Sequence, residues 1–177
     1  MPLDRRGTVL LIVDLQEGLL PVIAGGERIL AEAIALARAA RALGVPMLVT
    51  TRDAARLGAT HPALLAESPA GAAIDRMSFS SFGSRELVGR LRQWPARRQL
   101  LVCGTESHVC VVATVLGARR RGYDIVVARD AVGSIAEENR QRGLRRMARA
   151  GATLTSTVAI LAELAADPTP LEAQPGS

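Results

Sequence analysis

The chain has 177 residues, of which 49% are hydrophobic, and carries a formal net charge of +5. This length suits one domain with a sizeable core, so we predict a single domain over residues 1–166 and a disordered, proline-containing tail over residues 167–177. No uncharged apolar run approaches the roughly 20 residues that span a bilayer, and the first residues lack the apolar core of a signal peptide. We therefore expect a cytoplasmic protein with no membrane partner.

The basic residues and the two cysteines argue against a nucleic-acid-binding protein, a disulfide-stabilised protein and a dithiol redox protein. All 22 basic residues are arginine, because the chain contains no lysine, and aromatic residues make up only 2% of the sequence. Arginine clusters alone are weak evidence for phosphate binding in such a chain, and no nucleic-acid-binding motif is present, so we expect no nucleic-acid partner. Cys103 and Cys110 are too few for a disulfide framework and too far apart for a CxxC redox pair.

Apolar runs alternate with helical periodicities along the chain. The first run is continuous and β-branched, as expected for a central strand that is covered on both faces. The predicted strands are Thr8–Val13, Pro46–Thr51, Ala72–Arg76, Gln99–Cys103, Tyr123–Ala128 and Ala152–Thr155. The predicted helices are Glu27–Leu43, Ser84–Trp94, Val109–Arg121, Ala136–Ala150 and Thr157–Ala165. Residues 52–73 show no clear period, and residues 130–134 are predicted as a turn.

This alternation predicts an α/β fold of the doubly wound type. It would form three layers, α-β-α, around a mainly parallel sheet of about six strands, because β-α-β crossovers are right-handed. The chain contains neither GxGxxG nor GxxxxGK[ST], so nucleotide-binding versions of this fold are not supported and no cofactor is expected.

Three chemically distinct groups follow the predicted strands. Asp14 ends the first strand, Arg76 ends the third, and Cys110 lies just after the fourth. Ligands of open α/β sheets bind at this edge, so we predict that the three side chains meet there. A thiol nucleophile needs a base, a cation and N–H donors for an oxyanion, and the backbone around Thr105 and Glu106 offers such donors.

Cys110 is the predicted nucleophile. At the start of a helix, free N–H groups and the helix dipole favour a thiolate over a thiol. The alternative is a small core residue, which is what most free cysteines are. Asp14 is the preferred base, and His108 is the competing one. His108 and Cys110 are two residues apart at the start of a helix, so their side chains would point in different directions.

The chain resembles the isochorismatase-like cysteine hydrolases over nearly its whole length. The matching segments are Leu11-Ile-Val-Asp14-Leu-Gln16, Arg76-Met-Ser-Phe-Ser-Ser-Phe82, Val102-Cys-Gly-Thr-Glu-Ser-His-Val-Cys110-Val, Arg121-Gly-Tyr-Asp-Ile-Val-Val-Ala-Arg-Asp130-Ala and Gly151-Ala-Thr-Leu-Thr-Ser. The resemblance implies an Asp-Lys-Cys triad at Asp14, Arg76 and Cys110, a non-proline cis peptide at Thr105-Glu106, and self-association as a dimer or larger homo-oligomer.

Two departures from the family pattern affect the expected activity. Arg76 stands in the usual lysine position; arginine keeps the positive charge but does not exchange protons near neutral pH. Nicotinamidases of the family bind a metal through an aspartate and histidines after the second strand, whereas here only Asp53 and His61 remain and Ala55 replaces a histidine. We therefore expect no metal and no nicotinamidase activity. Isochorismatases proper lack the thiol, so Cys110 argues against that activity as well.

The resulting expectation is a hydrolase of a small amide or related C–N carbonyl compound. The Cys110 thiolate would attack the carbonyl to form an acyl-enzyme, with Asp14 as base and then acid. Gln16, Phe79, Phe82 and His108 are predicted to line the substrate site, although each has a core-packing or solvated-loop alternative. The competing hypothesis is a non-catalytic ligand-binding or scaffold protein that kept the fold.

Overall fold

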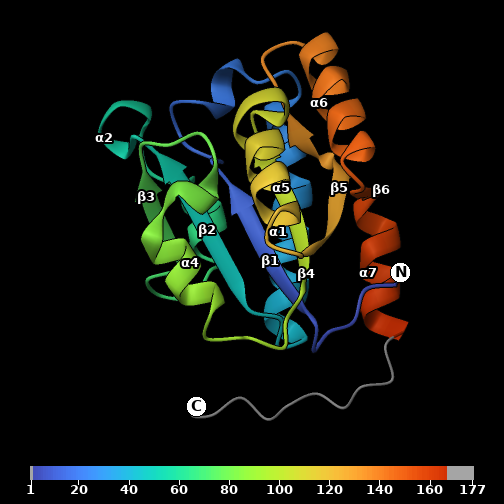
Figure 1. Ribbon diagram of the computed structural model, residues 1–177. Coiled ribbons are helices and arrows are strands. Elements are labelled where there is room, and N and C mark those ends of the chain that lie inside the picture. The colour runs from blue at the N-terminus through green and yellow to red at the C-terminus, as the bar shows by residue number, and fades with distance from the viewer. Residues whose placement is uncertain (1, 167–177) are drawn as a thin grey trace.

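The computed structural model describes residues 2–166 (Figure 1), and its centre is one six-stranded sheet with the strand order β3-β2-β1-β4-β5-β6. Every neighbouring pair of strands is parallel. The order reverses direction between β1 and β4, which are neighbours in space. The strands are β1 (Thr8–Val13), β2 (Met47–Arg52), β3 (Ala73–Arg76), β4 (Gln99–Thr105), β5 (Asp124–Gly133) and β6 (Thr153–Thr155).

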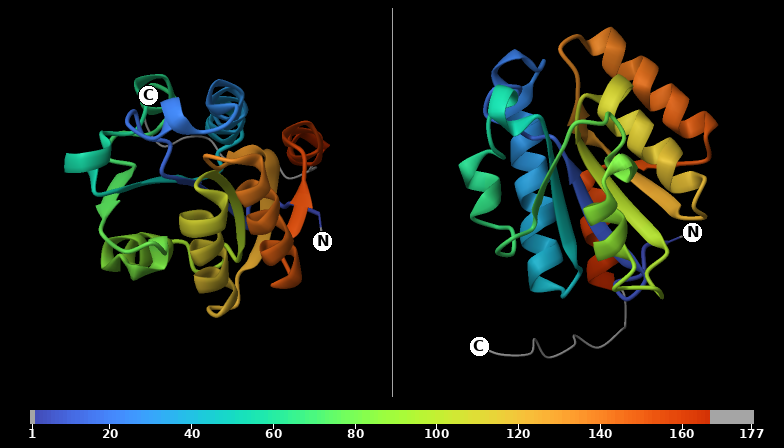
Figure 2. Two further views of the ribbon diagram at one scale, coloured as in Figure 1. Left: turned by 90° about the horizontal axis from the view of Figure 1, so that it is seen from above. Right: turned by 60° about the vertical axis from the view of Figure 1, so that its left-hand side comes forward.

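Helices cover both faces of the sheet, which confirms the predicted three-layer, doubly wound α/β class. Figure 2 shows α1 and α7 on one face and α4, α5 and α6 on the other. The helices are α1 (Gly26–Ala42), α2 (Ala54–Leu57), α3 (Pro62–Leu65), α4 (Arg85–Leu91), α5 (Val112–Arg119), α6 (Glu137–Arg149) and α7 (Thr157–Ala166). No helix within residues 2–166 is long and apolar enough to cross a bilayer.

The burial of β1 explains why its sequence is apolar without alternation. Leu10 and Ile12 pack into the core on the α1 side, while Val9, Leu11 and Val13 pack into the core on the α5 side. All six residues of the strand are buried. A strand buried on both faces places the residue that follows it, Asp14, inside the molecule.

Two strands are longer than predicted. β4 ends at Thr105 and not at Cys103, and β5 continues to Gly133, so the prediction of a turn over residues 130–134 is wrong. The register between the two strands shifts between Val102 and Gly104, and this irregularity lets Gly104 and Thr105 pair with Val132 and Gly133. A bulge of this kind leaves no periodic trace in the sequence.

Short helical turns occupy three segments where no helix was predicted, and one further turn extends a predicted helix toward its amino end. The segment over residues 52–73 contains α2 and α3, each of four residues. Three-residue 3-10 turns occur at Leu20–Val22 and Ser81–Gly83, and a π-helical turn at Ser107–Val111 precedes α5. The predicted tail, residues 167–177, lies outside the described residues.

Candidate active site

The carboxyl edge of the sheet brings Asp14, Arg76 and Cys110 together. Asp14 follows β1 directly, Arg76 is the last residue of β3, and Cys110 lies in the π-helical turn after β4. Because β1 and β4 are neighbours on either side of the reversal in strand order, this is the place where open α/β sheets bind ligands.

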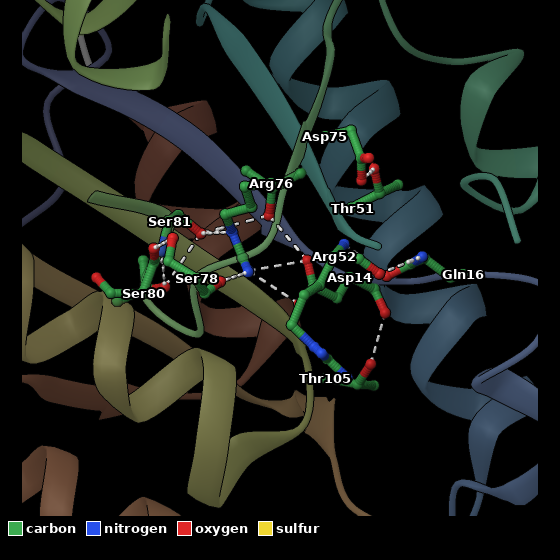
Figure 3. Close-up of polar contacts among 12 residues, drawn as sticks. Asp14, Gln16, Thr51, Arg52, Asp75, Arg76, Ser78, Ser80, Ser81 and Thr105 are labelled. Carbon is green, nitrogen blue, oxygen red and sulfur yellow. Dashed lines mark hydrogen bonds and ion pairs between the residues drawn. The ribbon is translucent and has the colours of Figure 1, made fainter. Parts of the chain in front are cut away.

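Asp14 and Arg76 form a buried ion pair across β2 (Figure 3). The Nη2 atom of Arg76 lies 3.0 Å from Oδ1 and 2.9 Å from Oδ2 of Asp14. The two side chains are 0% and 2% exposed, respectively. Removal of one partner from such a pair typically costs about 3–5 kcal/mol, because the other charge is left buried and unpaired.

Hydroxyl groups hold this ion pair in place. Thr50 donates to Oδ1 of Asp14 at 3.1 Å, and the Nε atom of Arg76 donates to the Ser81 hydroxyl at 3.3 Å. Thr114 of α5 donates to the same Ser81 oxygen at 3.1 Å, and Arg76 Nη1 donates to the Ser78 carbonyl. Sequence reasoning missed Thr50, Ser81 and Thr114; only the serine-rich segment after Arg76 hinted at them.

The backbone at the end of β1 is also constrained. Asp14 has φ 52°, in the left-handed region that residues other than glycine rarely adopt. The Thr105 hydroxyl donates to the Asp14 carbonyl at 2.6 Å, so β4 fixes the turn that aims the Asp14 side chain. Thr105 therefore contacts Asp14 through its side chain, in addition to any role of its backbone.

Cys110 lies beside both charged groups and is 5% exposed. Burial, followed by the charge and hydrogen bond of Asp14, raises the pKa of the Cys110 thiol to about 12, although Arg76 acts in the opposite direction. The expectation that the helix start lowers this pKa is therefore wrong for the free protein, since desolvation of the sulfur and a neighbouring carboxylate dominate. The direction of this pKa shift favours the thiol over the thiolate.

Burial also raises the pKa of Asp14, although Arg76, Cys110 and Thr50 all act to lower it. A carboxylate with a raised pKa is a stronger base than an exposed aspartate. A side-chain hydrogen bond between Asp14 and Cys110 contributes to both pKa shifts, so Asp14 is the nearby acceptor for the thiol proton.

His108 points to a different partner. Its Nδ1 atom lies 3.0 Å from the Ser134 hydroxyl, which in turn lies 2.8 Å from the Ser107 hydroxyl. His108 is not among the groups that shift the Cys110 pKa. Its side chain therefore turns toward the end of β5, as expected for two residues that diverge at a helix start.

The peptide bond between Thr105 and Glu106 is cis, which confirms the geometry implied by the resemblance. The carboxylate of Glu106 accepts a hydrogen bond from the Ile135 N–H at 3.3 Å. None of the hydrogen bonds formed among residues 2–166 uses the N–H of Glu106. This N–H therefore has donor capacity left beside the nucleophile turn.

The other three predicted lining residues lie in different environments. Gln16 is fully buried; its amide donates to the carbonyls of Arg52 and Gly58 and accepts from the Arg52 N–H, so it fastens the loop after β2. Phe79 is 56% exposed, with the Arg52 guanidinium 5.4 Å from its ring centre. Phe82 is buried and packs on Tyr123, with ring centres 5.9 Å apart. Whether any of them touches substrate remains a prediction.

Asp53 and His61 are both used locally. The Asp53 carboxylate accepts from Arg56 at 3.0 Å, and His61 Nδ1 accepts from the Ala63 N–H at 3.3 Å. Within the part of the chain that the structure describes, no three His, Cys, Asp or Glu side chains lie close enough together to hold one metal ion.

Comparisons with known proteins agree with this architecture. The chain is 35% identical over 171 residues to the secreted isochorismatase effector Isc1 of Phytophthora sojae, covering 92% of this chain and 79% of Isc1. Its fold is similar to that of the MAR1 ribonuclease of Caenorhabditis elegans, with a TM-score of 0.88, 28% identity and coverage of 95% and 88% of the two chains. It is also similar to the YcaC gene product of Escherichia coli, described as an octameric hydrolase of unknown specificity, with a TM-score of 0.89, 28% identity and coverage of 94% and 83%.

The match to the family as a whole is longer than any single motif. A model of the isochorismatase domain matches residues 8–159, a range that begins with β1 and ends within α7. It includes Asp14, Arg76 and Cys110. The chain is a member of the isochorismatase family.

Proposed function

We propose that this protein is a hydrolase of small amides or related C–N carbonyl compounds, with Cys110 as nucleophile, Asp14 as base and acid, and Arg76 as the fixed positive charge. The observation that carries the proposal is the buried contact among these three side chains. Membership of the isochorismatase family supports hydrolase chemistry in general.

The proposed reaction starts from the thiol and not from a preformed thiolate. As the Cys110 sulfur attacks the substrate carbonyl carbon, its proton passes to Asp14, and the carbonyl oxygen becomes an oxyanion. The N–H groups of Glu106 and Cys110 are the proposed donors to this oxyanion. Asp14 then gives its proton to the leaving nitrogen as the C–N bond breaks, which leaves a thioester. Water, deprotonated by Asp14, hydrolyses the thioester and restores the thiol.

Arg76, which stands in the lysine position of the family, can serve as the fixed positive charge beside Asp14 and Cys110. The guanidinium stays charged throughout, because an arginine does not lose its proton in proteins. An ion pair with Arg76 alone would weaken Asp14 as a base. Burial outweighs this effect and raises the pKa of Asp14, so the carboxylate keeps enough basicity to accept the thiol proton.

The first test is to trap the nucleophile. Iodoacetamide should alkylate Cys110 in the folded protein and leave Cys103 untouched, because Cys103 is fully buried. Since the pKa of Cys110 is raised to about 12, the rate should rise about tenfold for each pH unit between pH 7 and 10, without a plateau. Peptide mapping by mass spectrometry measures both the site and the rate.

The matched control for this test is Cys110→Ala, which should give no adduct and no release of ammonia or amine from a panel of small amides and ureido compounds. When the unsubstituted protein turns over a substrate from that panel and the reaction is stopped rapidly with acid, mass spectrometry should show an acyl group on Cys110. Equal labelling of both cysteines, or turnover in Cys110→Ala, would exclude Cys110 as the nucleophile.

The rival hypothesis, a non-catalytic binding protein, makes a different prediction for Arg76→Lys. If the protein is an enzyme, the parent is active and Arg76→Lys stays within about tenfold of it. Lysine keeps the charge but loses the guanidinium contacts to Ser78 and Ser81. If the chain has lost its chemistry, the parent is inert and Arg76→Lys gains activity. Amine release from the same panel, with circular dichroism as the folding control, distinguishes the two.

We also propose that the protein acts as a homo-oligomer in the cytoplasm. Support for self-association comes from the octameric YcaC and from exposed apolar side chains near the site, Met77, Phe79 and Ile135, which are 71%, 56% and 57% exposed. The printed name of Isc1 describes it as secreted, so family membership by itself does not decide the location of this chain.

A further inference from the structure

A surface cavity between α4 and α5 has an unusual charge pattern. It has a volume of about 240 Å³, and two of its lining residues, Arg98 and Tyr123, directly precede β4 and β5, at the edge of the sheet opposite Asp14. Its wall consists of three arginines, two aromatic residues and two aliphatic residues, and we call it the arginine cavity. The lining residues are Phe82, Val88, Leu91, Arg92, Arg98, Arg121 and Tyr123.

Arg98 and Arg121 are held in place on the wall of the arginine cavity. The Arg98 guanidinium lies 4.5 Å from the Tyr123 ring centre and donates to the Arg121 carbonyl at 2.7 Å. The Arg121 guanidinium lies 5.0 Å from the Phe82 ring centre and donates to the Gly117 carbonyl at 3.1 Å. Each guanidinium carries five N–H donors and uses only one of them in a hydrogen bond within residues 2–166. Pre-ordered cations with free donors lose little conformational entropy on binding an anion.

Among the described residues that line the arginine cavity, none carries a carboxylate. The acidic side chains nearest to the lining residues in sequence are already paired: Glu86 with Arg90 at 2.6 Å, and Asp124 with Arg119 at 3.3 Å. None of Arg92, Arg98 and Arg121 forms an ion pair within the described residues 2–166. Three positive charges therefore surround one hollow without a counter-charge.

The general excess of arginine does not explain this arrangement. Several arginines elsewhere on the surface lie against carboxylates: Arg38 and Arg41 share Glu67, Arg56 pairs with Asp53, and Arg142 pairs with Glu138. Others, such as Arg145 on α6, form no ion pair within residues 2–166, so it is the convergence of three guanidiniums, and not the lack of partners alone, that distinguishes the arginine cavity. A chain-wide bias toward arginine predicts paired and scattered side chains. It does not predict three unpaired guanidiniums that converge on one cavity beside ordered aromatic rings.

We propose that the arginine cavity binds a small phosphate-bearing metabolite through Arg92, Arg98 and Arg121. Guanidinium forks match the oxygen geometry of phosphate and bind it through charge-assisted hydrogen bonds. A volume of about 240 Å³ accommodates a phosphate or diphosphate group with a few waters, each of which takes about 30 Å³ in the liquid. One guanidinium lies over each of the Phe82 and Tyr123 rings, so one face of each ring already has a stacking partner.

Inorganic pyrophosphate is the probe for the experiment, measured by isothermal titration calorimetry at low salt with the full chain. The unsubstituted protein should bind it, and Arg92→Gln and Arg98→Gln should each weaken binding at least tenfold. Arg92→Gln is the safer variant, because the Arg92 side chain makes no hydrogen bond or ion pair within residues 2–166, so its loss leaves the fold intact. Arg145→Gln on α6 is the matched control, because it removes the same charge from an exposed position. The affinity of this variant for pyrophosphate should stay within twofold of that of the unsubstituted protein.

Three outcomes would overturn the proposal. One is no binding of pyrophosphate at all. Another is an equal loss of affinity in Arg92→Gln and Arg145→Gln, which would reduce the effect to net charge. The third is tighter binding of a single-stranded oligoribonucleotide than of pyrophosphate in the same buffer, which would assign the surface to a nucleic-acid backbone. Orthophosphate and a phosphomonoester, run in parallel, separate a free phosphate ligand from an esterified one. None of these measurements depends on turnover, so they are independent of the proposed hydrolase.

Discussion

Asp14→Asn should move two properties of the site in opposite directions. Hydrolytic turnover should fall by about 10²–10⁴-fold, because the proposed proton acceptor and donor is lost. Alkylation of Cys110 by iodoacetamide should become faster. Asp14 raises the pKa of Cys110 through its charge and its hydrogen bond, whereas Arg76 lowers it, so removal of the carboxylate leaves the thiol next to an uncompensated cation.

The size of the second effect follows from two opposing trends. Far below the pKa, each unit by which the Cys110 pKa falls gives ten times more thiolate. The nucleophilicity of each thiolate drops by about threefold over the same interval, so labelling at fixed pH should speed up by about threefold per unit. The pH dependence of labelling, followed by mass spectrometry, gives the pKa of each variant.

The folding control matters because Asp14→Asn removes a charge from a buried ion pair. The asparagine oxygen still accepts from Arg76 and Thr50, so the fold should survive with reduced stability, and circular dichroism checks this before labelling. A result in which turnover and labelling both fall, in a folded variant, would mean that Asp14 positions Cys110 without acting on its proton. Unchanged turnover would remove Asp14 from the mechanism.

The largest expected effect on stability belongs to Gly104→Ala. A Cβ atom at residue 104 would lie 1.9 Å from the Val13 carbonyl oxygen and 2.7 Å from the Val13 nitrogen, and the residue has φ +124°. These contacts are with the backbone of the central strand, which pairs with β4 at this position, so no side chain rotation relieves them. We expect a loss of more than about 4 kcal/mol of the free energy of unfolding, a large share of a typical total.

Gly44→Ala is the matched control for this substitution. Gly44 also has a positive φ, +68°, but a Cβ atom there would meet nothing within 4 Å. Its cost should be limited to the left-handed conformation, about 1–2 kcal/mol. Urea unfolding curves of both variants give the comparison, and failure of Gly104→Ala alone to fold is the extreme form of the expected result. Free energies of unfolding for the two variants that agree within about 1 kcal/mol would mean that β1 and β4 do not approach as closely as described.

The sequence alone determined the fold class and the edge of the sheet at which Asp14, Arg76 and Cys110 lie. A continuous apolar run predicts a strand covered on both faces, as Val9 to Val13 confirm. The alternation of such runs with helical periods leaves few topologies, because crossovers are right-handed and parallel strands end at one edge. Asp14 and Arg76 end their strands and Cys110 follows the next one, so the edge on which they lie could be derived without coordinates.

Only the tertiary structure decided the protonation state of Cys110 and the surroundings of Arg76. The pKa of the thiol depends on how much water reaches the sulfur and on the distance to Asp14, and both are set by three segments that are far apart in the chain. The same holds for Thr50, Ser81 and Thr114, which are unremarkable in sequence and converge only because β2, the segment after β3 and α5 pack together. Local sequence encodes periodicity and caps, whereas desolvation and convergence are properties of the assembled core.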